Sequence, residues 1–161
     1  MNAINFGCGI RHTTFEGFDK TLNIDIRPDV KPDVLAEAFS LPVVKGEVGL
    51  MFTSHVFEHF GPQDNRKLLR YWHSLMPKGG KLWIIIPNLE FACVQILRDG
   101  EPDSNSMDIL YGHQEYKENF HKNGFTKKSL RKFVDILGLY KIISCENISN
   151  GFEIELKAET I

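Results

Sequence analysis

The sequence alternates short apolar runs with longer segments in which apolar residues recur every three to four positions. Short runs that stop at Gly or Pro are typical of buried strands, and the longer period is typical of amphipathic helices. The apolar runs predict strands at residues 3–6, 21–25, 34–36, 48–53 and 81–86. The helical period predicts helices at residues 63–76, 89–98 and 127–137.

The last part of the chain has a different pattern. Apolar or alternating runs at 139–145 and 152–156 flank the dipeptide Asn150-Gly151. Asn-Gly is the preferred pair in two-residue type I′ turns, so we expect these two strands to pair antiparallel. Strands that alternate with helices form a mainly parallel sheet. The whole pattern therefore predicts an α/β fold whose mainly parallel sheet ends in a C-terminal antiparallel hairpin.

Composition narrows the class of protein. With 161 residues, of which 42% are hydrophobic and 25% charged, the chain has the makeup of one ordinary globular domain, 1–161. A formal net charge of -2 disfavours binding to nucleic-acid phosphates. A local basic group is expected to be the solvated face of a helix; it consists of Lys127, Lys128, Arg131 and Lys132.

The cysteines and the hydropathy favour a cytoplasmic protein. Cys8, Cys93 and Cys145 form no CxxC pair and are odd in number, which is typical of free thiols in a reducing compartment. No stretch approaches the length of about 18 apolar residues that a membrane span needs, and no basic region precedes the first apolar run. We therefore expect neither a membrane span nor a signal peptide.

A glycine turn and an acidic residue follow the first two predicted strands. Gly7-Cys8-Gly9 ends the first strand, and Asp25 ends the second strand 16 residues after Gly9. Glycines at the carboxyl end of a parallel strand let the backbone approach a ligand closely. An acidic residue after the next strand can accept hydrogen bonds from both ribose hydroxyls. Together they predict a cofactor that contains a nucleoside.

A nicotinamide dinucleotide is disfavoured as that cofactor. Its fingerprint needs a third glycine that opens a helix, and His12 stands at that position. The residues from Ile10 to Lys20 also leave little space for a full helix, and no second domain is present to hold a hydride acceptor.

Six segments from about Ile4 to Leu139 resemble a known family in order and spacing. They are NFGCG, GFDKTLNIDI, AEAFSLP, SHVFEHF, LMPKGGKLWIIIPNLE and NGFTKKSLRKFVDILGL. The set resembles the small class I S-adenosylmethionine-dependent methyltransferases with LNLGCG and SHVLEH motifs. The resemblance implies a Rossmann-like three-layer sandwich with a seven-stranded sheet and a final antiparallel strand. It also implies S-adenosylmethionine as the cofactor and S-adenosylhomocysteine as the product.

The resemblance assigns cofactor contacts to the ends of the first four strands. Gly7, Cys8 and Gly9 would border the methionine part, Asp25 the ribose, Ile26, Glu37 and Ala38 the adenine, and Ser54 and His55 the transferable methyl. The chain departs from the family pattern at two positions. Asn5 stands where an acidic residue is common, and Arg11 stands where many members have a further glycine.

The segment His55-Val56-Phe57-Glu58-His59 also matches a zinc-protease pattern, H-x-x-E-H. Zinc would need both histidines on one helical face and a third ligand on a later helix. Here the motif follows a buried strand and meets Gly61-Pro62, which leaves about one helical turn. We therefore expect no metal. A packing role for Glu58 and His59 stays open beside a contact of Glu58 with the acceptor.

A second polar cluster precedes the last predicted helix. The resembling family uses this segment on the acceptor side of the cleft, so we expect Tyr111 and Gln114, with Glu58, to contact the methyl acceptor. A hydroxyl acceptor needs a base, for which His55 is the first choice and His113 and His121 are the alternatives. The family association suggests a small molecule or a glycan as the acceptor, and O-methylation as the reaction.

Short crossovers distinguish this chain from a full-length Rossmann-like domain. About eight residues separate Asp25 from Val34, whereas a parallel crossover normally needs a dozen or more. We expect shortened N-terminal helices and an uncovered apolar face, which a second copy in a homodimer or a partner would cover. The alternative to an enzyme is a non-catalytic S-adenosylmethionine-binding or protein-interaction module with the same fold.

Overall fold

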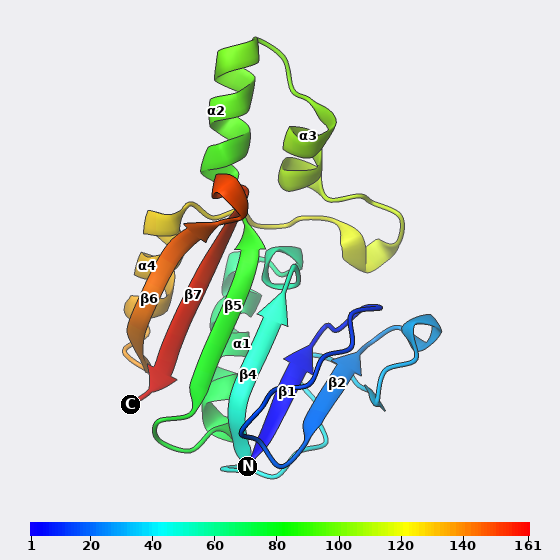
Figure 1. Ribbon diagram of the computed structural model, residues 1–161, viewed down its shortest axis with the longest axis vertical. Coiled ribbons are helices and arrows are strands. Elements are labelled where there is room, and N and C mark those ends of the chain that lie inside the picture. Colours follow the sequence, from blue (N-terminus) through cyan, green and yellow to red (C-terminus); the bar gives the residue numbers. More distant parts are fainter.

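A twisted seven-stranded sheet organises the protein, whose computed structural model describes residues 1–161 (Figure 1). The strand order is β3-β2-β1-β4-β5-β7-β6. The strands are β1 (Asn2–Phe6), β2 (Thr21–Asp25), β3 (Val34–Leu35), β4 (Val48–Ser54), β5 (Lys81–Pro87), β6 (Tyr140–Ile148) and β7 (Glu153–Thr160). Each predicted strand is therefore present, with bounds that differ by a few residues.

The first five strands are parallel, and β7 runs antiparallel to both β5 and β6. This is the predicted Rossmann-like sheet with its closing hairpin, which is confirmed. The hairpin turn differs in length from the predicted two-residue turn. Ile148 pairs with Glu153, so four residues make the connection. Ser149 and Asn150 in this connection both have positive φ, 52° and 55°.

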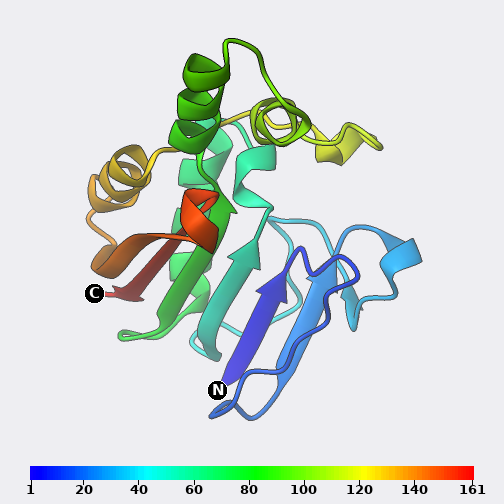
Figure 2. The ribbon, with the colours of Figure 1, turned by 45° about the horizontal axis from the view of Figure 1, so that its top comes forward.

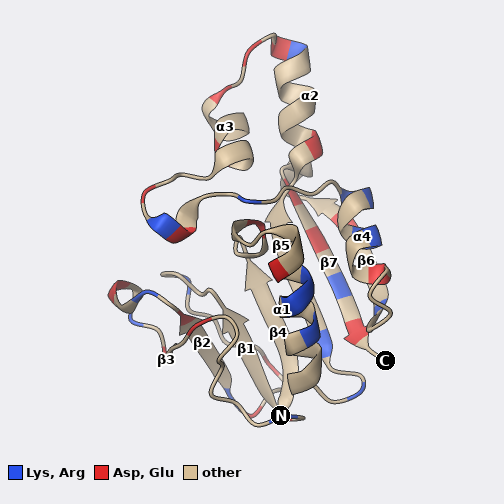
Figure 3. Ribbon diagram, turned by 180° about the vertical axis from the view of Figure 1, so that it is seen from behind, with Lys and Arg blue, Asp and Glu red and all other residues tan.

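Four α-helices surround the sheet unevenly: α1 (Pro62–Leu75), α2 (Leu89–Asp99), α3 (Ser104–Tyr111) and α4 (Lys127–Asp135). Figures 1 and 3 show α1 and α4 against one face of the sheet. Figure 2 shows α2 and α3 beyond the carboxyl ends of the parallel strands. Neither α2 nor any other helix has the length and apolar character needed to cross a membrane.

The helix ends follow from local sequence. Asn88 caps α2 by accepting a hydrogen bond from the Glu90 N–H, and Gly100 ends this helix with a φ of 78°. Thr126 begins α4 in a reciprocal capping box with Ser129. The short helix α3 was not predicted, because its sequence buries only two residues and has little helical periodicity.

The main core lies between the sheet and the pair α1 and α4. Trp72 of α1 is fully buried and meets Phe6 of β1 edge to face, with 5.4 Å between ring centroids. Phe57, in the 3₁₀ turn η2 (Phe57–His59), stacks on Phe125 at 5.8 Å. These aromatic contacts anchor the segments that follow β4 and precede α4, and so position the side chains of η2.

The opposite face of the sheet has no α-helix (Figure 1). The connections that precede β4 contain none, and the four helices lie elsewhere. Its layer is reduced to the coil between β1 and β2, in agreement with the predicted shortening of the N-terminal helices. The Phe15 ring of this coil lies 5.1 Å from Phe52 and 6.1 Å from Trp83. The Lys157 ammonium lies 4.5 Å above the Trp83 ring. Aromatic packing and a charged side chain thus replace part of the missing cover.

Candidate cofactor and acceptor site

The candidate residues gather at the carboxyl ends of β1, β2, β4 and β5, beneath α3 and the segment 112–124 (Figure 2). Open α/β sheets bind ligands at this edge, beside the point where the strand order reverses. Here β1 lies between β2 and β4, so the reversal falls where the glycine turn leaves β1.

The glycine turn is folded tightly against its neighbours. Gly7 has a φ of 68°, and a Cβ there would lie 2.2 Å from Val56 Cγ2, so no other residue fits without movement. The N–H groups of Gly7 and Cys8 both donate to the Ile24 carbonyl, at 2.8 and 3.0 Å. The turn therefore keeps its backbone close to the edge where a ligand would lie.

Asp25 shapes this turn as well as the end of β2. Its carboxylate oxygens accept hydrogen bonds from the Gly9 N–H at 2.8 Å and from the Arg27 N–H at 2.9 Å. A carboxylate has about four acceptor positions, so two protein donors leave capacity for ribose hydroxyls. Asp25 is nevertheless buried, which makes it a structural residue of the turn in addition to a candidate ribose ligand.

Asn5 explains one departure from the methyltransferase pattern. Its Nδ2 group donates to the Arg11 carbonyl at 3.0 Å and to Asn23 Oδ1 at 2.9 Å. Asn23 Oδ1 also accepts from the Thr13 N–H at 2.9 Å. An acidic side chain at this position would place a carboxylate against two acceptors, so the path of the coil after the glycine turn requires an amide here.

Cys8 is buried in the same turn. Burial, together with the nearby Asp25 carboxylate, raises the pKa of its thiol to about 11. The thiol is therefore protonated at neutral pH and serves as a small apolar group rather than as a nucleophile.

An open pocket of about 520 Å³ lies at the carboxyl ends of β2 and β3. Its lining residues are Ile26, Leu35, Ala36, Glu37, Ser40 and Pro42. Ile26, which is 48% exposed, contributes an apolar side chain to this lining, and Glu37 contributes a carboxylate. Two of the three residues expected at an adenine, Ile26 and Glu37, thus line one pocket. Ala38 does not line it, because its side chain packs against the core.

His55 follows Ser54 at the end of β4 with an unusual backbone. Its φ is 55°, and its N–H donates to the Ile85 carbonyl at 3.0 Å. Its ring meets Glu153 of β7, with 2.5 Å between Nε2 and Oε1. Since a carboxylate only accepts, Nε2 carries the proton and Nδ1 is the basic nitrogen of the neutral ring.

Glu153 is the carboxylate of this pair. Burial alone would raise its pKa, but hydrogen bonds from Ser149 and His55 outweigh that effect and hold the pKa below its ordinary value. The carboxylate is therefore ionised near neutral pH and can stabilise a protonated His55.

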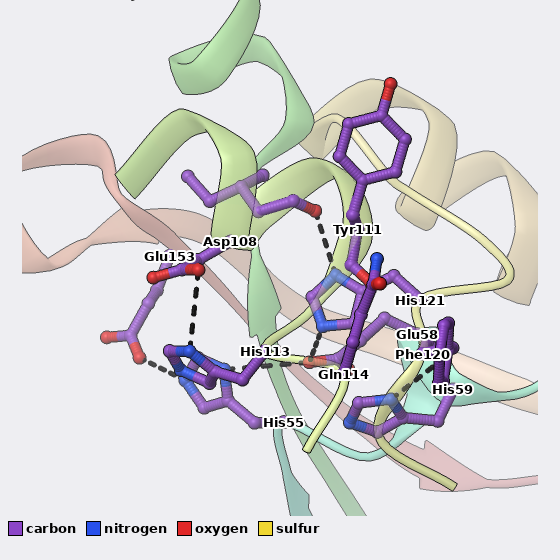
Figure 4. Close-up of polar contacts among 11 residues, drawn as sticks. His55, Glu58, His59, Asp108, Tyr111, His113, Gln114, Phe120, His121 and Glu153 are labelled. Atoms are coloured by element: carbon purple, nitrogen blue, oxygen red, sulfur yellow. Dashed lines mark hydrogen bonds and ion pairs between the residues drawn. The ribbon is translucent and has the colours of Figure 1, made fainter. Parts of the chain in front are cut away.

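Glu58 lies behind His55 and is only 2% exposed (Figure 4). Its Oε1 lies 3.6 Å from His55 Nδ1 and 3.9 Å from His121 Nε2, and neither carboxylate oxygen has a hydrogen bond. Burial, and to a smaller degree the charge of Glu153, raises the pKa of Glu58 to about 8. The structure thus places Glu58 inside the cluster rather than on its open side.

The segment after α3 contributes unequally to this cluster. His121 is nearly buried, and its Nδ1 donates to the Ile109 carbonyl at 2.8 Å. His113 is 64% exposed and pairs with Asp108 at 3.4 Å. Figure 4 shows the Tyr111 ring turned away from the cluster, and Gln114 is also exposed. Of the expected acceptor-side residues, the structure joins only His121 with His55 and Glu58.

Two contacts of the site were not predicted from the sequence. Glu153 lies 98 positions from His55 in the chain, and no sequence pattern indicates that the two residues are in contact. The Arg27 guanidinium lies 4.5 Å from the ring centroid of Tyr116, which joins the end of β2 to the segment 112–124. Tyr116 and Phe120 are the two large aromatic residues of this mostly polar segment, and Tyr116 is the one that makes the second contact.

Comparison with known proteins supports the fold. No protein-family model and no curated protein sequence matches the chain. One similar solved structure is the complex between the Haloferax volcanii Trm112 methyltransferase activator and a methyltransferase. A chain of this complex aligns with a TM-score of 0.71 and 11% identity, over 99% of this chain and 82% of that one. An S-adenosylmethionine-dependent methyltransferase from Aquifex aeolicus aligns at 0.68 and 13%, over 100% and 82%.

A third similar structure was solved with ligands. It is the Burkholderia thailandensis 1,6-didemethyltoxoflavin-N1-methyltransferase with its substrate and S-adenosylhomocysteine bound. Its TM-score is 0.66 at 11% identity, over 99% of this chain and 70% of that one. At these identities the comparisons show that the chain has the class I methyltransferase fold.

Proposed function

We propose that the protein is a single-domain, cytoplasmic S-adenosylmethionine-dependent methyltransferase. The observation that carries the proposal is the pocket lined by Ile26 and Glu37 beside the turn of Gly7 to Gly9. An apolar side chain and a carboxylate acceptor suit the ring and the amino group of an adenine. The three free cysteines agree with a reducing compartment.

The residues present fit the cofactor part by part. Ile26 and Glu37 would hold the adenine, Asp25 the ribose, and the backbone of Gly7, Cys8 and Gly9 the methionine part. Ser54 and His55 would border the reactive end, since they end β4 next to this turn. When bound, the cofactor supplies an electrophilic methyl group on a sulfonium.

His55 gives this chain a base for a hydroxyl acceptor. Glu153 accepts the Nε2–H and orients the ring, so Nδ1, which lies 3.6 Å from the buried Glu58 carboxyl group, is the nitrogen that would accept the acceptor's proton. The charge of Glu153 then stabilises the imidazolium that forms. We propose O-methylation of a small molecule or glycan on this basis. His121 lies in the same cluster, and His113, Tyr111 and Gln114 are exposed on the neighbouring segment.

Methyl transfer is tested directly by release of S-adenosylhomocysteine in the presence of a panel of small hydroxyl acceptors, sugars included. With a productive acceptor, His55→Gln should lower kcat by about 10²-fold or more, because general-base help is typically of that size. His73→Gln in α1, a histidine whose ring packs on Tyr140 away from the cluster, is the matched control. Equal rates in both variants would exclude His55 as the base.

A homodimer, or a complex with a protein partner, is proposed for the β3 edge. Leu35 of this two-residue edge strand is exposed, as are Phe39 and Val44 in the connection from β3 to β4. Exposed apolar side chains next to an open strand edge favour association. Light scattering at several protein concentrations tests the homodimer, and Val44→Lys should shift a dimer toward monomer.

A further inference from the structure

The side chains of Glu58, His59 and His121 are of types that can bind a metal ion, and they lie close together. Their candidate ligand atoms all lie within 4.8 Å of one another. Glu58 and His59 belong to the turn η2, and His121 comes from the segment after α3, about 60 residues later. Figure 4 shows the three side chains converging from these two segments.

Backbone hydrogen bonds fix how both histidines present their nitrogens. His121 Nδ1 lies 2.8 Å from the Ile109 carbonyl, and His59 Nδ1 lies 3.2 Å from the Phe120 carbonyl. A carbonyl oxygen only accepts, so each neutral ring donates Nδ1–H and keeps its lone pair on Nε2. Histidines that bind metals typically donate their other ring N–H to a carbonyl or carboxylate in this way.

Glu58 supplies the second, independent observation. It is a buried carboxyl group whose two oxygens have no hydrogen-bond partner, and one of them faces His121 Nε2 at 3.9 Å. A buried polar group without a partner is costly, and an ionised carboxylate costs far more unless a cation compensates its charge. A divalent ion between Glu58 and the two imidazoles would provide that compensation.

We propose that Glu58, His59 and His121 bind a divalent first-row transition-metal ion of the Zn²⁺ type. Two imidazoles with one carboxylate suit such ions, whereas Mg²⁺ and Ca²⁺ prefer oxygen ligands alone. Three protein ligands leave one tetrahedral position for a water or another oxygen ligand. The ion would also tie the segment after α3 to η2.

This site is not the arrangement expected from the H-x-x-E-H pattern. That pattern requires the first histidine as a ligand, but His55 turns its Nε2 to Glu153. The third ligand is instead His121, which lies on a loop segment and not on a helix. The spacing within residues 55–59 therefore could not reveal the site.

Metal binding is measured on the tag-free 161-residue protein after removal of metals with a chelator. Calorimetric titration with Zn²⁺ should give one equivalent of binding, and Mg²⁺ should give none. His121→Ala should weaken Zn²⁺ binding at least about 100-fold, since even loss of an outer hydrogen-bond partner costs about 10–100-fold. His113→Ala, an exposed histidine of the same segment, should leave the affinity unchanged.

Co²⁺ gives a readout that needs no variant. The Co²⁺-loaded wild-type protein should show the visible d–d absorption of a site with nitrogen and oxygen ligands. It should lack the charge-transfer band that would appear if Co²⁺ bound the thiolate of the exposed Cys93 instead. Absence of Zn²⁺ binding at about 1 mM free metal, a thiolate band, or binding that survives His121→Ala in a folded protein would each overturn the proposal. None of these titrations contains S-adenosylmethionine, so they are independent of the proposed function.

Discussion

His55 Nε2 lies 2.5 Å from Glu153 Oε1, although the two residues are 98 positions apart in the chain. His55 follows β4 and Glu153 begins β7, and β5 lies between these strands in the sheet. The contact therefore forms only when the C-terminal hairpin has paired with the parallel part of the sheet. It orients the one histidine at the candidate methyl-transfer position.

Glu153→Gln should remove an acid-sensitive part of the stability. The folded pKa of Glu153 is lowered, so its contribution is present above the ordinary value of about 4.5 and is lost as pH falls through the folded value. We expect the variant to lose about 1 kcal/mol at pH 7 through the weakened hydrogen bond. Urea unfolding between pH 3 and 7 measures this, and the difference from wild type should shrink as pH falls. A constant difference, or the same profile for Glu159→Gln on the same strand, contradicts the assignment.

In metal-free protein, Glu58→Gln should change the pH dependence of stability in the direction opposite to Glu153→Gln. The folded pKa of Glu58 is raised to about 8, so its favourable contribution is fully present below about 4.5 and is lost as pH rises to about 8. An amide cannot ionise, so the variant should gain stability relative to wild type as pH rises from 5 to 8.

The difference in unfolding free energy between wild type and Glu58→Gln reports the titration of Glu58 and not that of the neighbouring histidines. Burial lowers the pKa of His121, and it lowers the pKa of His59 to about 4. Both histidines, with His55 and Glu153, are present in both proteins and largely cancel in the difference. A pH-independent difference would show that Glu58 titrates normally, and Glu101→Gln on the surface is the control.

Gly7→Ala should destabilise the glycine turn strongly. Left-handed strain costs about 1 kcal/mol, and the 2.2 Å approach to Val56 Cγ2 adds overpacking of about 1–3 kcal/mol. Gly46→Ala has a similar φ, 83°, but no atom within 4 Å, so it should lose only about 1 kcal/mol. Thermal unfolding of both variants compares them, and equal losses would show that Val56 does not constrain the turn.

Only one thiol should react quickly with a disulfide reagent at pH 8. Cys93 is exposed, whereas Cys8 and Cys145 are buried, and burial raises the pKa of both buried thiols. Cys93→Ser should therefore abolish the fast phase, and unfolding should reveal the other two thiols. A fast thiol that persists in the folded variant would contradict the buried position of Cys8 or Cys145.

The sequence predicted those features that depend on local periodicity. The β5 strand, the amphipathic face of α1 and the Thr126 cap each follow from a short pattern, as does the position of Gly7 to Gly9 and Asp25 at strand ends. The helix α3 has too few buried residues to produce such a pattern.

Contacts within the candidate site depend instead on register between distant strands. The alternation of β7 indicates which residues share a face, but only its pairing with β5 brings Glu153 beside His55. The role of Asn5 likewise depends on the path of the coil up to Arg11 and Thr13, which no periodic pattern describes. Side-chain meetings of this kind require the folded structure.

Binding of S-adenosylmethionine tests the central claim most directly. Calorimetry should give a dissociation constant on the order of 1–100 μM for the cofactor, and a similar value for S-adenosylhomocysteine. Ile26→Asp, which places a charge in the lining of the pocket, should weaken binding at least about tenfold, whereas Leu97→Asp on the exposed side of α2 should not. No binding at about 1 mM ligand by folded protein, or equal affinity in both variants, would contradict the proposed cofactor site.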